Sequence, residues 1–245
     1  MNIALLGYGR MGREVEHAAR ERHHTISAVF NSAHPLANST SHSHLAGTDC
    51  CVDFSTAAIV PHHIRTTTAL RIPLVVGTTG WNTHFDELKH FVVEHDGAIL
   101  YASNFSIGAQ IFFRAVTTAA ALLDRFPGYD IAIHEIHHSM KKDAPSGTAL
   151  ALAEKILAHV QRKRTINTSP AAKPESLTVS STRVGTVAGT HSVIMNSPAD
   201  TIELTHTAHN RSGFALGAVM AAEWLQGKHG VFTMEDFLFS QSAQR

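Results

Sequence analysis

Side chains that can donate a proton or bind an anion gather in residues 133–150. The segment reads Ile-His-Glu-Ile-His-His-Ser-Met-Lys-Lys-Asp-Ala-Pro-Ser-Gly-Thr-Ala-Leu, and it contains His137, His138, Lys141 and Lys142. Histidine exchanges a proton near neutral pH, and lysine adds positive charge. The segment is therefore suited to proton transfer onto an anionic substrate.

A strand and a helix are expected on either side of this segment. Apolar and polar residues alternate up to Ile136, which is typical of a half-buried strand. Ser146 precedes a run rich in Ala and Leu and is expected to cap a helix. The N–H groups of Gly147 and Thr148 could then hold a carboxylate at the positive end of the helix dipole. A plain cap or a solvated loop would explain each residue alone, but their combination favours a catalytic loop.

Length and charge limit the classes of function. The chain has 245 residues, enough for one large domain or two small ones, and its 20 basic and 20 acidic residues cancel. We therefore expect no nucleic-acid partner and no membrane partner. The first apolar run, residues 1–6, is too short for a signal peptide, and no later run reaches membrane-spanning length. Cys50 and Cys51 are adjacent, which disfavours a disulfide framework, so we expect a cytoplasmic protein.

The 19 histidines are scattered along the chain. A metal site would call for fixed spacing, such as two histidines four residues apart on a helix with a carboxylate nearby. No such set is present, so we interpret these histidines as surface residues and predict no metal site.

A glycine-rich turn stands at the start of the chain. The apolar run at residues 2–6 predicts a buried parallel strand, and residues 10–21 predict a helix. Between them lies the pattern G-x-G-x-x-G, which allows a tight turn, approach of a pyrophosphate and close packing of helix on strand. The expected dinucleotide contacts in this turn are Gly7, Tyr8, Gly9, Arg10, Met11 and Gly12.

Asn31 follows the second predicted strand, residues 25–30, where an acidic residue usually binds the adenosine ribose. Asparagine can still bond a ribose and does not repel a 2′-phosphate, which Arg10 could attract. The expected cofactor is therefore NADPH or NADH, without a strict preference for NADH.

Strands and helices alternate through the rest of the first half, which predicts a doubly wound parallel sheet. The expected strands are residues 49–54, 73–76 and 98–101, and the expected helices are residues 57–70 and 81–95. The polar stretch 32–47 predicts a loop. Residues 77–80 follow a strand directly, so they either approach the cofactor at the carboxyl edge of the sheet or form an ordinary turn.

The second half has a different composition and predicts a smaller α+β domain with a mixed or antiparallel sheet covered by helices on one face. The expected helices are 108–123 and 148–163, the expected strands are 177–184, 190–195 and 201–207, and 165–176 is an expected loop. Arg183 and His191 either approach the catalytic loop or lie on the sheet surface. A last helix, residues 213–226, resembles those of the first half. The predicted fold is thus α/β, with a Rossmann-type domain at 1–103 and 213–245 and a substrate-binding and oligomerisation domain at 104–212.

The segment from Glu135 to Thr148 resembles the signature E-x-H-H-x-x-K-x-D-A-P-S-G-T of the dihydrodipicolinate reductase (4-hydroxy-tetrahydrodipicolinate reductase) family. The resemblance covers the whole chain. Further landmarks in family order are the N-terminal glycine turn, Val52-Asp53-Phe54, Gly77-Thr78-Thr79-Gly80, Ser103-Asn104-Phe105-Ser106, Arg183-Val184-Gly185 and Gly189-Thr190-His191.

The resemblance implies roles for individual residues. His137 matches the family's proton donor or acceptor, and Lys141 matches its second proton donor. The positions implied for the dicarboxylate substrate are His138, Ser146, Gly147 and Thr148. The positions implied for the nicotinamide side of the cofactor are Gly77, Thr78, Thr79, Ala102, Ser103, Asn104 and Phe105.

The implied reaction transfers a hydride from NAD(P)H to the fourth ring carbon of a cyclic imine, with water lost from its hydroxylated precursor. The product is tetrahydrodipicolinate, in diaminopimelate and lysine biosynthesis. The resemblance also implies a homotetramer assembled through the sheet of the second domain. Two positions depart from the family pattern: Asn31 replaces an acidic residue, and Lys142 adds a charge.

Three alternatives remain open on the sequence. A different nicotinamide dehydrogenase acting on an aspartate-derived substrate would keep the glycine turn without needing the His-His-x-x-Lys loop. A non-catalytic NAD(P)H sensor would bind the cofactor without turnover, although the intact pair of His137 and Lys141 argues against it. A metal-binding role for the many histidines is the weakest of the three.

Overall fold

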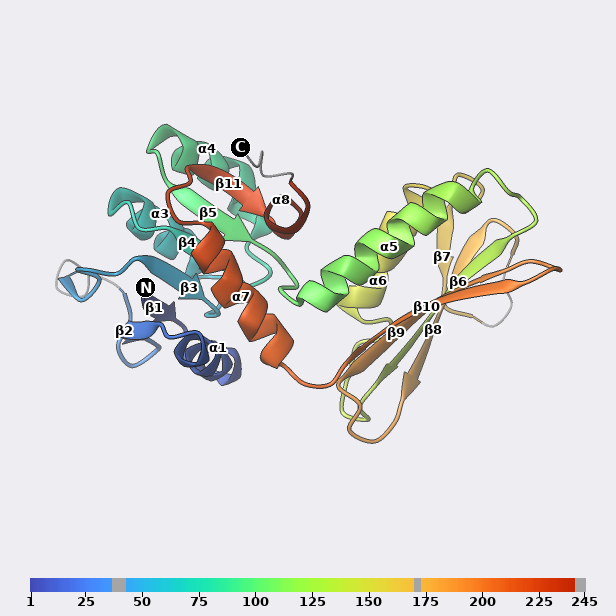
Figure 1. The fold of residues 1–245 in the computed structure, drawn as a ribbon, viewed down its shortest axis with the longest axis horizontal. Coiled ribbons are helices and arrows are strands. Elements are labelled where there is room, and N and C mark those ends of the chain that lie inside the picture. Colours follow the sequence, from blue (N-terminus) through green and yellow to red (C-terminus); the bar gives the residue numbers. More distant parts are fainter. Residues whose placement is uncertain (37–42, 170–172, 241–245) are drawn as a thin grey trace. The chain divides into compact units, whose positions relative to one another are not determined.

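A computed structural model describes residues 1–36, 43–169 and 173–240. The described chain forms two compact units (Figure 1). Unit 1 comprises residues 1–107 and 211–245, and unit 2 comprises residues 108–210. Residues 37–42 of the loop expected at 32–47, and residues 170–172 of the loop expected at 165–176, lie outside the described residues.

Unit 1 is built on a six-stranded parallel sheet in the order β11-β5-β4-β3-β1-β2 (Figure 1). The strands are β1 (Asn2–Leu6), β2 (Thr25–Phe30), β3 (Cys50–Asp53), β4 (Leu74–Val76), β5 (Ala98–Tyr101) and β11 (Gly230–Thr233). β3 and β4 are buried along their whole length, as expected for central strands covered on both faces.

Helices cover both faces of this sheet, so the expected doubly wound, Rossmann-type fold is confirmed. The helical elements are α1 (Arg10–Glu21), α3 (Val60–Ala69), the 3₁₀ turn η1 (Asn82–His84), α4 (Phe85–Glu94), α7 (Ser212–Trp224) and α8 (Met234–Phe239). α1 and α7 pack on one face of the strands, and α3 and α4 pack on the other. Pro61 lies in the first turn of α3, where its missing N–H costs no helical hydrogen bond.

Unit 2 holds a five-stranded mixed sheet in the order β10-β9-β6-β8-β7. The strands are β6 (Asp130–His137), β7 (Thr165–Asn167), β8 (Ser176–Arg183), β9 (Gly189–Asn196) and β10 (Thr201–Ala208). β6 pairs with β8 in parallel and with β9 in antiparallel orientation. The helices α5 (Ile107–Leu123) and α6 (Gly147–Leu157) share the apolar core of the sheet's covered face (Figure 1).

Four details differ from the sequence-based expectations. The helix expected at 148–163 ends at Leu157, because the apolar spacing that Val160 continues belongs to a buried turn after the helix. Residues 165–167 form the short strand β7 rather than a loop, since three residues at a sheet edge are too few to show alternation. β11 and α8 were not expected at all.

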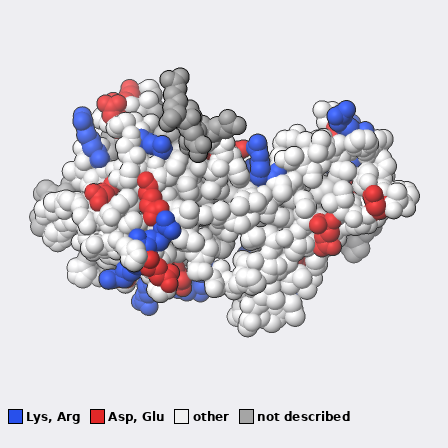
Figure 2. All heavy atoms as spheres, in the orientation of Figure 1, with Lys and Arg blue, Asp and Glu red and all other residues white. Residues whose placement is uncertain are grey.

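Charged side chains are mixed in sign on the face drawn in Figure 2, where lysine and arginine atoms lie among aspartate and glutamate atoms. None of the helices within the described residues is both long enough and apolar enough to cross a membrane.

Candidate active site

The turn between β1 and α1 needs glycine at two positions. Gly7 has a φ of 96°, and a Cβ there would lie 2.4 Å from the carbonyl oxygen of Phe54. A Cβ on Gly12 would lie 2.3 Å from the carbonyl oxygen of Gly7. A side chain at Gly7 would clash with the connection after β3, and one at Gly12 would push α1 away from the end of β1. The backbone therefore stays close to the sheet edge, as a pyrophosphate-binding turn requires.

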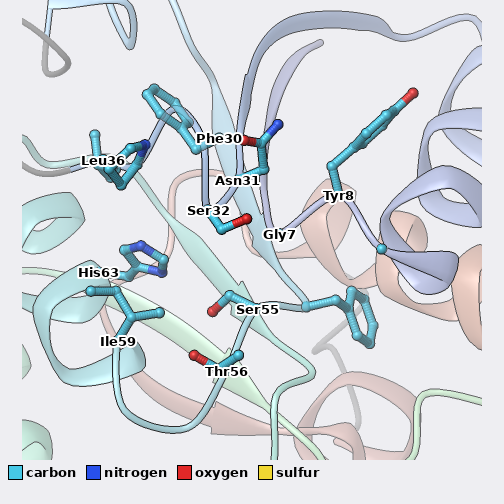
Figure 3. Close-up of a pocket in the computed structure, with 13 residues that line it drawn as sticks. Gly7, Tyr8, Phe30, Asn31, Ser32, Leu36, Ser55, Thr56, Ile59 and His63 are labelled. Atoms are coloured by element: carbon cyan, nitrogen blue, oxygen red, sulfur yellow. The ribbon is translucent and has the colours of Figure 1, made fainter.

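A pocket of about 520 Å³ opens beside this turn (Figure 3). Its wall is formed by the turn itself, the end of β2 and the connection from β3 to α3. The lining residues include Gly7, Tyr8, Gly9, Asn31, Ser32, Ser55, Thr56, Ile59 and His63. Three of the expected cofactor residues in the turn thus line the pocket, whereas Arg10, Met11 and Gly12 belong to α1.

Asn31 lies at the pocket (Figure 3), and its side-chain oxygen already accepts two hydrogen bonds. Its Oδ1 accepts the backbone N–H groups of Ala33 at 2.9 Å and His34 at 3.0 Å. The side chain can therefore offer a cofactor only its amide N–H donors. Donors suit a phosphate or a ribose oxygen, so this geometry is compatible with NADPH as well as NADH. Arg10 is exposed at the start of α1.

Asp53 organises the neighbouring loops, a role that sequence reasoning did not assign. Its carboxylate is fully buried at the end of β3. Oδ1 accepts the hydroxyl groups of Ser55 at 2.6 Å and Thr78 at 2.8 Å, and Oδ2 lies 2.7 Å from Nδ1 of His63. One carboxylate thereby ties together β3, α3 and the loop after β4, which contains the expected cofactor residues Gly77 and Thr79.

The residues after β5 lie at the same edge of the sheet. The N–H of Ala102 donates to the carbonyl of Val76 at 3.1 Å, which joins the ends of β4 and β5. Asn104 accepts the N–H of Ser106 at 2.9 Å, and Phe105 is buried with its ring 6.1 Å from that of Phe54. The segments at 77–79 and 102–105, Ser103 included, therefore meet at the carboxyl edge, where parallel sheets bind cofactors.

The expected catalytic loop connects β6 to α6 in unit 2. His137 ends β6 and is buried, His138 is half-buried, and Lys142 is exposed. Lys141 forms an ion pair with Asp143, with 2.9 Å between Nζ and Oδ1.

Ser146 caps α6 as expected, since its Oγ accepts the N–H of Ala149 at 3.2 Å, an interaction typically worth about 1 kcal/mol. Gly147 is the first residue of the helix and is exposed, and Thr148 is half-buried. The first N–H groups of α6 are thus placed for an anion, as a helix N-terminus allows.

Glu135 lies at the centre of this site, and the structure brings Arg183 and His191 to it. Its Oε1 accepts the N–H of Ser146 at 3.0 Å, the hydroxyl of Ser181 at 2.8 Å and Nη2 of Arg183 at 2.8 Å. Its Oε2 lies 3.3 Å from Nδ1 of His137 and 3.6 Å from Nε2 of His191. Sheet register explains the cluster, because Glu135 pairs with Ser181 on β8 and with His191 on β9.

The surroundings decide the charges of these groups. Burial opposes ionisation of Glu135, but hydrogen bonds from Ser146, Arg183 and Ser181 outweigh it and lower its pKa to about 2. Burial lowers the pKa of His137, and that of His191 falls to about 4. At neutral pH the cluster therefore contains a carboxylate and a neutral His191.

Three of these side chains also present possible metal-ligand atoms. One atom each from Glu135, His137 and His191 lies within 4.8 Å of the others. The members of this group come from two strands, so they do not show the helical spacing expected of a metal site. The carboxylate is already paired with the guanidinium of Arg183, which weakens its attraction for a cation. We therefore interpret the group as a proton-transfer cluster.

Models of the two parts of one known protein family match the chain. A model described as Dihydrodipicolinate reductase, N-terminus, matches residues 1–105, and one described as Dihydrodipicolinate reductase, C-terminus, matches residues 108–238. The chain belongs to the dihydrodipicolinate reductase family. This membership confirms the resemblance seen in the sequence and the expected class of enzyme, an NAD(P)H-dependent oxidoreductase.

Two named relatives of the reductase family cover nearly the whole chain. One from Christiangramia forsetii, named 4-hydroxy-tetrahydrodipicolinate reductase, is 41% identical over 97% of this chain and 98% of its own length. One of the same name from Rickettsia bellii is 38% identical over 97% of this chain and 94% of its own length.

A solved structure shares the fold of the chain. It is a dipicolinate-bound dihydrodipicolinate reductase from Paenisporosarcina sp. TG-14, with a TM-score of 0.79 and 21% identity. The match covers 97% of this chain and 99% of that one.

Proposed function

We propose that the chain reduces 4-hydroxy-tetrahydrodipicolinate to tetrahydrodipicolinate with NADH or NADPH, in diaminopimelate and lysine biosynthesis. The observation that carries the proposal is the complete E-x-H-H-x-x-K-x-D-A-P-S-G-T segment, which runs from the end of β6 through the connecting loop into the first turn of α6. Relatives that bear the reductase name match almost the full chain, which supports the same substrate.

Unit 1 would hold the cofactor, which supplies a hydride when bound. Gly7 and Gly9 leave the backbone open to the pyrophosphate, and Asn31 offers donors to the ribose or its 2′-phosphate. The segments at 77–79 and 102–105 would line the nicotinamide. Asp53 keeps the first of these segments in place through Thr78, so the nicotinamide side would be bound by a pre-formed loop.

Unit 2 would bind the dicarboxylate. The N–H groups of Gly147 and Thr148 at the start of α6 suit one carboxylate, and the imidazole of His138 adds a further donor. Lys141 contributes positive charge in the same loop. The dipicolinate named in the solved family structure is a small dicarboxylate, which supports this class of ligand.

His137 and Lys141 would deliver the proton that completes the reduction. Burial lowers the pKa of His137, which disfavours the imidazolium in the free protein and makes its proton easier to donate. Lys141 forms an ion pair with Asp143 within the same loop. We expect His137→Gln and Lys141→Ala each to lower turnover far more than cofactor affinity, because both act on the transition state.

We also propose that the protein is cytoplasmic and homotetrameric, as the family resemblance implies. Light scattering on the purified protein checks the tetramer, and a monomeric mass would contradict it.

The test of function follows the absorbance of NADPH and NADH while the preceding enzyme of the pathway generates the substrate from pyruvate and aspartate semialdehyde. We expect substrate-dependent oxidation that His137→Gln abolishes or strongly reduces. Tight cofactor binding without oxidation would instead indicate a sensor or a dehydrogenase of another substrate. The rates of oxidation of NADPH and NADH, measured under the same conditions, show which cofactor the protein uses faster.

A further inference from the structure

We propose that Glu135 is a positioning residue that holds His137 in the tautomer protonated at Nδ1, so that Nε2 is the atom that exchanges a proton with the substrate. The inference rests on the proposed role of His137 in proton transfer. It also assigns to Glu135 a second task, because the same carboxylate accepts the N–H of Ser146, the residue that caps the anion-binding end of α6.

The orientation of the carboxylate is fixed by its first oxygen. Oε1 accepts one N–H group, one hydroxyl and one guanidinium N–H, from Ser146, Ser181 and Arg183. These donors come from the start of α6 and from two positions on β8. A carboxylate held by three donors from separate backbone positions cannot rotate without losing several hydrogen bonds.

The second oxygen then faces the two imidazoles. Oε2 lies 3.3 Å from Nδ1 of His137 and 3.6 Å from Nε2 of His191. Within the described residues neither Oε2 nor Nδ1 makes a hydrogen bond, so each is the nearest buried polar group left to satisfy the other. An ionised carboxylate only accepts hydrogen bonds. A proton on Nδ1 is therefore attracted to Oε2, whereas a lone pair there would face a negative charge in a buried setting.

The opposite edge of the His137 ring lies close to the backbone of Gly189. A Cβ on Gly189 would come within 2.9 Å of Nε2, so a residue without a side chain stands next to that atom. The free nitrogen thus adjoins backbone rather than a competing side chain. This arrangement assigns the two ring nitrogens different tasks: Nδ1 orients the ring and Nε2 transfers the proton.

The charges around His137 support the same assignment. The titratable groups that act on it are Glu135, Lys141, Asp143, Arg183 and His191. Because His191 stays neutral at pH 7, the carboxylate remains available to stabilise His137 when that ring is protonated. Lys141 and Arg183 oppose the protonated state, so removal of the carboxylate would leave only Asp143 in its favour.

The experiment compares Glu135→Gln with Ser181→Ala. The first variant keeps the shape of the side chain but turns an amide donor toward His137, which favours the other tautomer. The second removes one donor to Oε1 and leaves Oε2 in place. Nitrogen NMR of histidine-labelled protein reports the tautomer, with the His137 signals identified by their loss in His137→Gln.

We expect wild-type His137 to carry its proton on Nδ1, and Glu135→Gln to move it to Nε2. Turnover of Glu135→Gln should fall by roughly 10²- to 10⁴-fold, the range that a positioned acid or base contributes. The acidic limb of its pH profile should also shift, because the carboxylate no longer favours the imidazolium. Ser181→Ala should keep the proton on Nδ1 and lose less turnover than Glu135→Gln, because Oε2 stays in place and Oε1 keeps two of its three donors.

A proton on Nε2 in the wild-type protein overturns the proposal, and this measurement does not depend on the stability of any variant. A folded Glu135→Gln protein with wild-type turnover would overturn it equally. Failure of the proposed function gives a different result: the wild-type protein would not oxidise NAD(P)H with this substrate, while the NMR spectrum would still report the tautomer of His137.

Discussion

Acid should destabilise unit 2 through His191 before most of its carboxylates titrate. His191 is 5% exposed, and burial is the main reason that the pKa of its imidazole falls from 6.5 to about 4. Its neighbour His137 lowers the pKa further, and Glu135 only partly opposes this. The folded state thus resists a proton that the unfolded chain accepts readily.

The size of the effect follows from proton linkage. A depressed pKa contributes stability that is fully present above 6.5 and falls as the pH approaches 4. At pH 5 protonation of this histidine stabilises the unfolded state by about 2 kcal/mol relative to the folded state. The full loss of folding stability, about 3 kcal/mol, is reached below pH 4. Replacing His191 with glutamine removes this titration while keeping a polar group at the position of Nε2.

Hydrogen exchange of the amides in β6 and β9, measured by mass spectrometry, reports the opening of unit 2 alone. Between pH 7 and pH 5 the wild type should lose about 20-fold more protection than His191→Gln, after correction for intrinsic exchange rates. Titrating groups that do not interact with His191 are common to both proteins and cancel in the comparison. Equal losses in the two proteins would refute the claim that His191 is buried in its neutral form.

Three further predictions concern catalysis and cofactor choice. His137→Gln and Lys141→Ala should lower kcat by roughly 10²-fold or more while the Kd for NADPH, measured by fluorescence, stays within about 3-fold; the reverse pattern would contradict their assignment. Asn31→Asp should weaken the binding of NADPH relative to that of NADH by about 1–4 kcal/mol, because a carboxylate near the 2′-phosphate repels it. The ratio of kcat/KM for the two cofactors checks this, and an unchanged ratio would mean that the phosphate does not lie near Asn31. Gly189→Ala should lower kcat by roughly 10-fold, because its Cβ would come within 2.9 Å of Nε2 of His137 and displace the ring; wild-type kinetics would show that the ring moves without consequence.

Much of the site could be predicted from sequence because it depends on residues that are neighbours along the chain. The glycine turn, the strand before His137 and the serine cap of α6 each depend on neighbouring residues, so their types and spacing were sufficient. The family signature then supplied roles for single residues. Those roles remain predictions for the experiments above.

The carboxylate cluster could not be predicted in the same way. Glu135 and His191 meet because β6 and β9 pair in one particular register, which depends on packing over the whole sheet. One signal was nevertheless present in the sequence. The alternation of Ile131 and Ile133 continues through Glu135 and His137, so both polar residues belong to the buried face of β6. A buried carboxylate needs partners, and a search for them would have pointed to neighbouring strands.

The order of segments in unit 1 has a consequence for synthesis of the protein. Its core includes Ala215, Ala218 and Val219 of α7, and its sheet is completed by β11, yet these follow residues 108–210 in the chain. At roughly 5–20 residues per second, the ribosome needs on the order of 5–20 seconds to make that insert. We therefore expect unit 2 to complete its fold first, while the part of unit 1 made earlier lacks α7 and β11 and leaves part of one sheet face exposed.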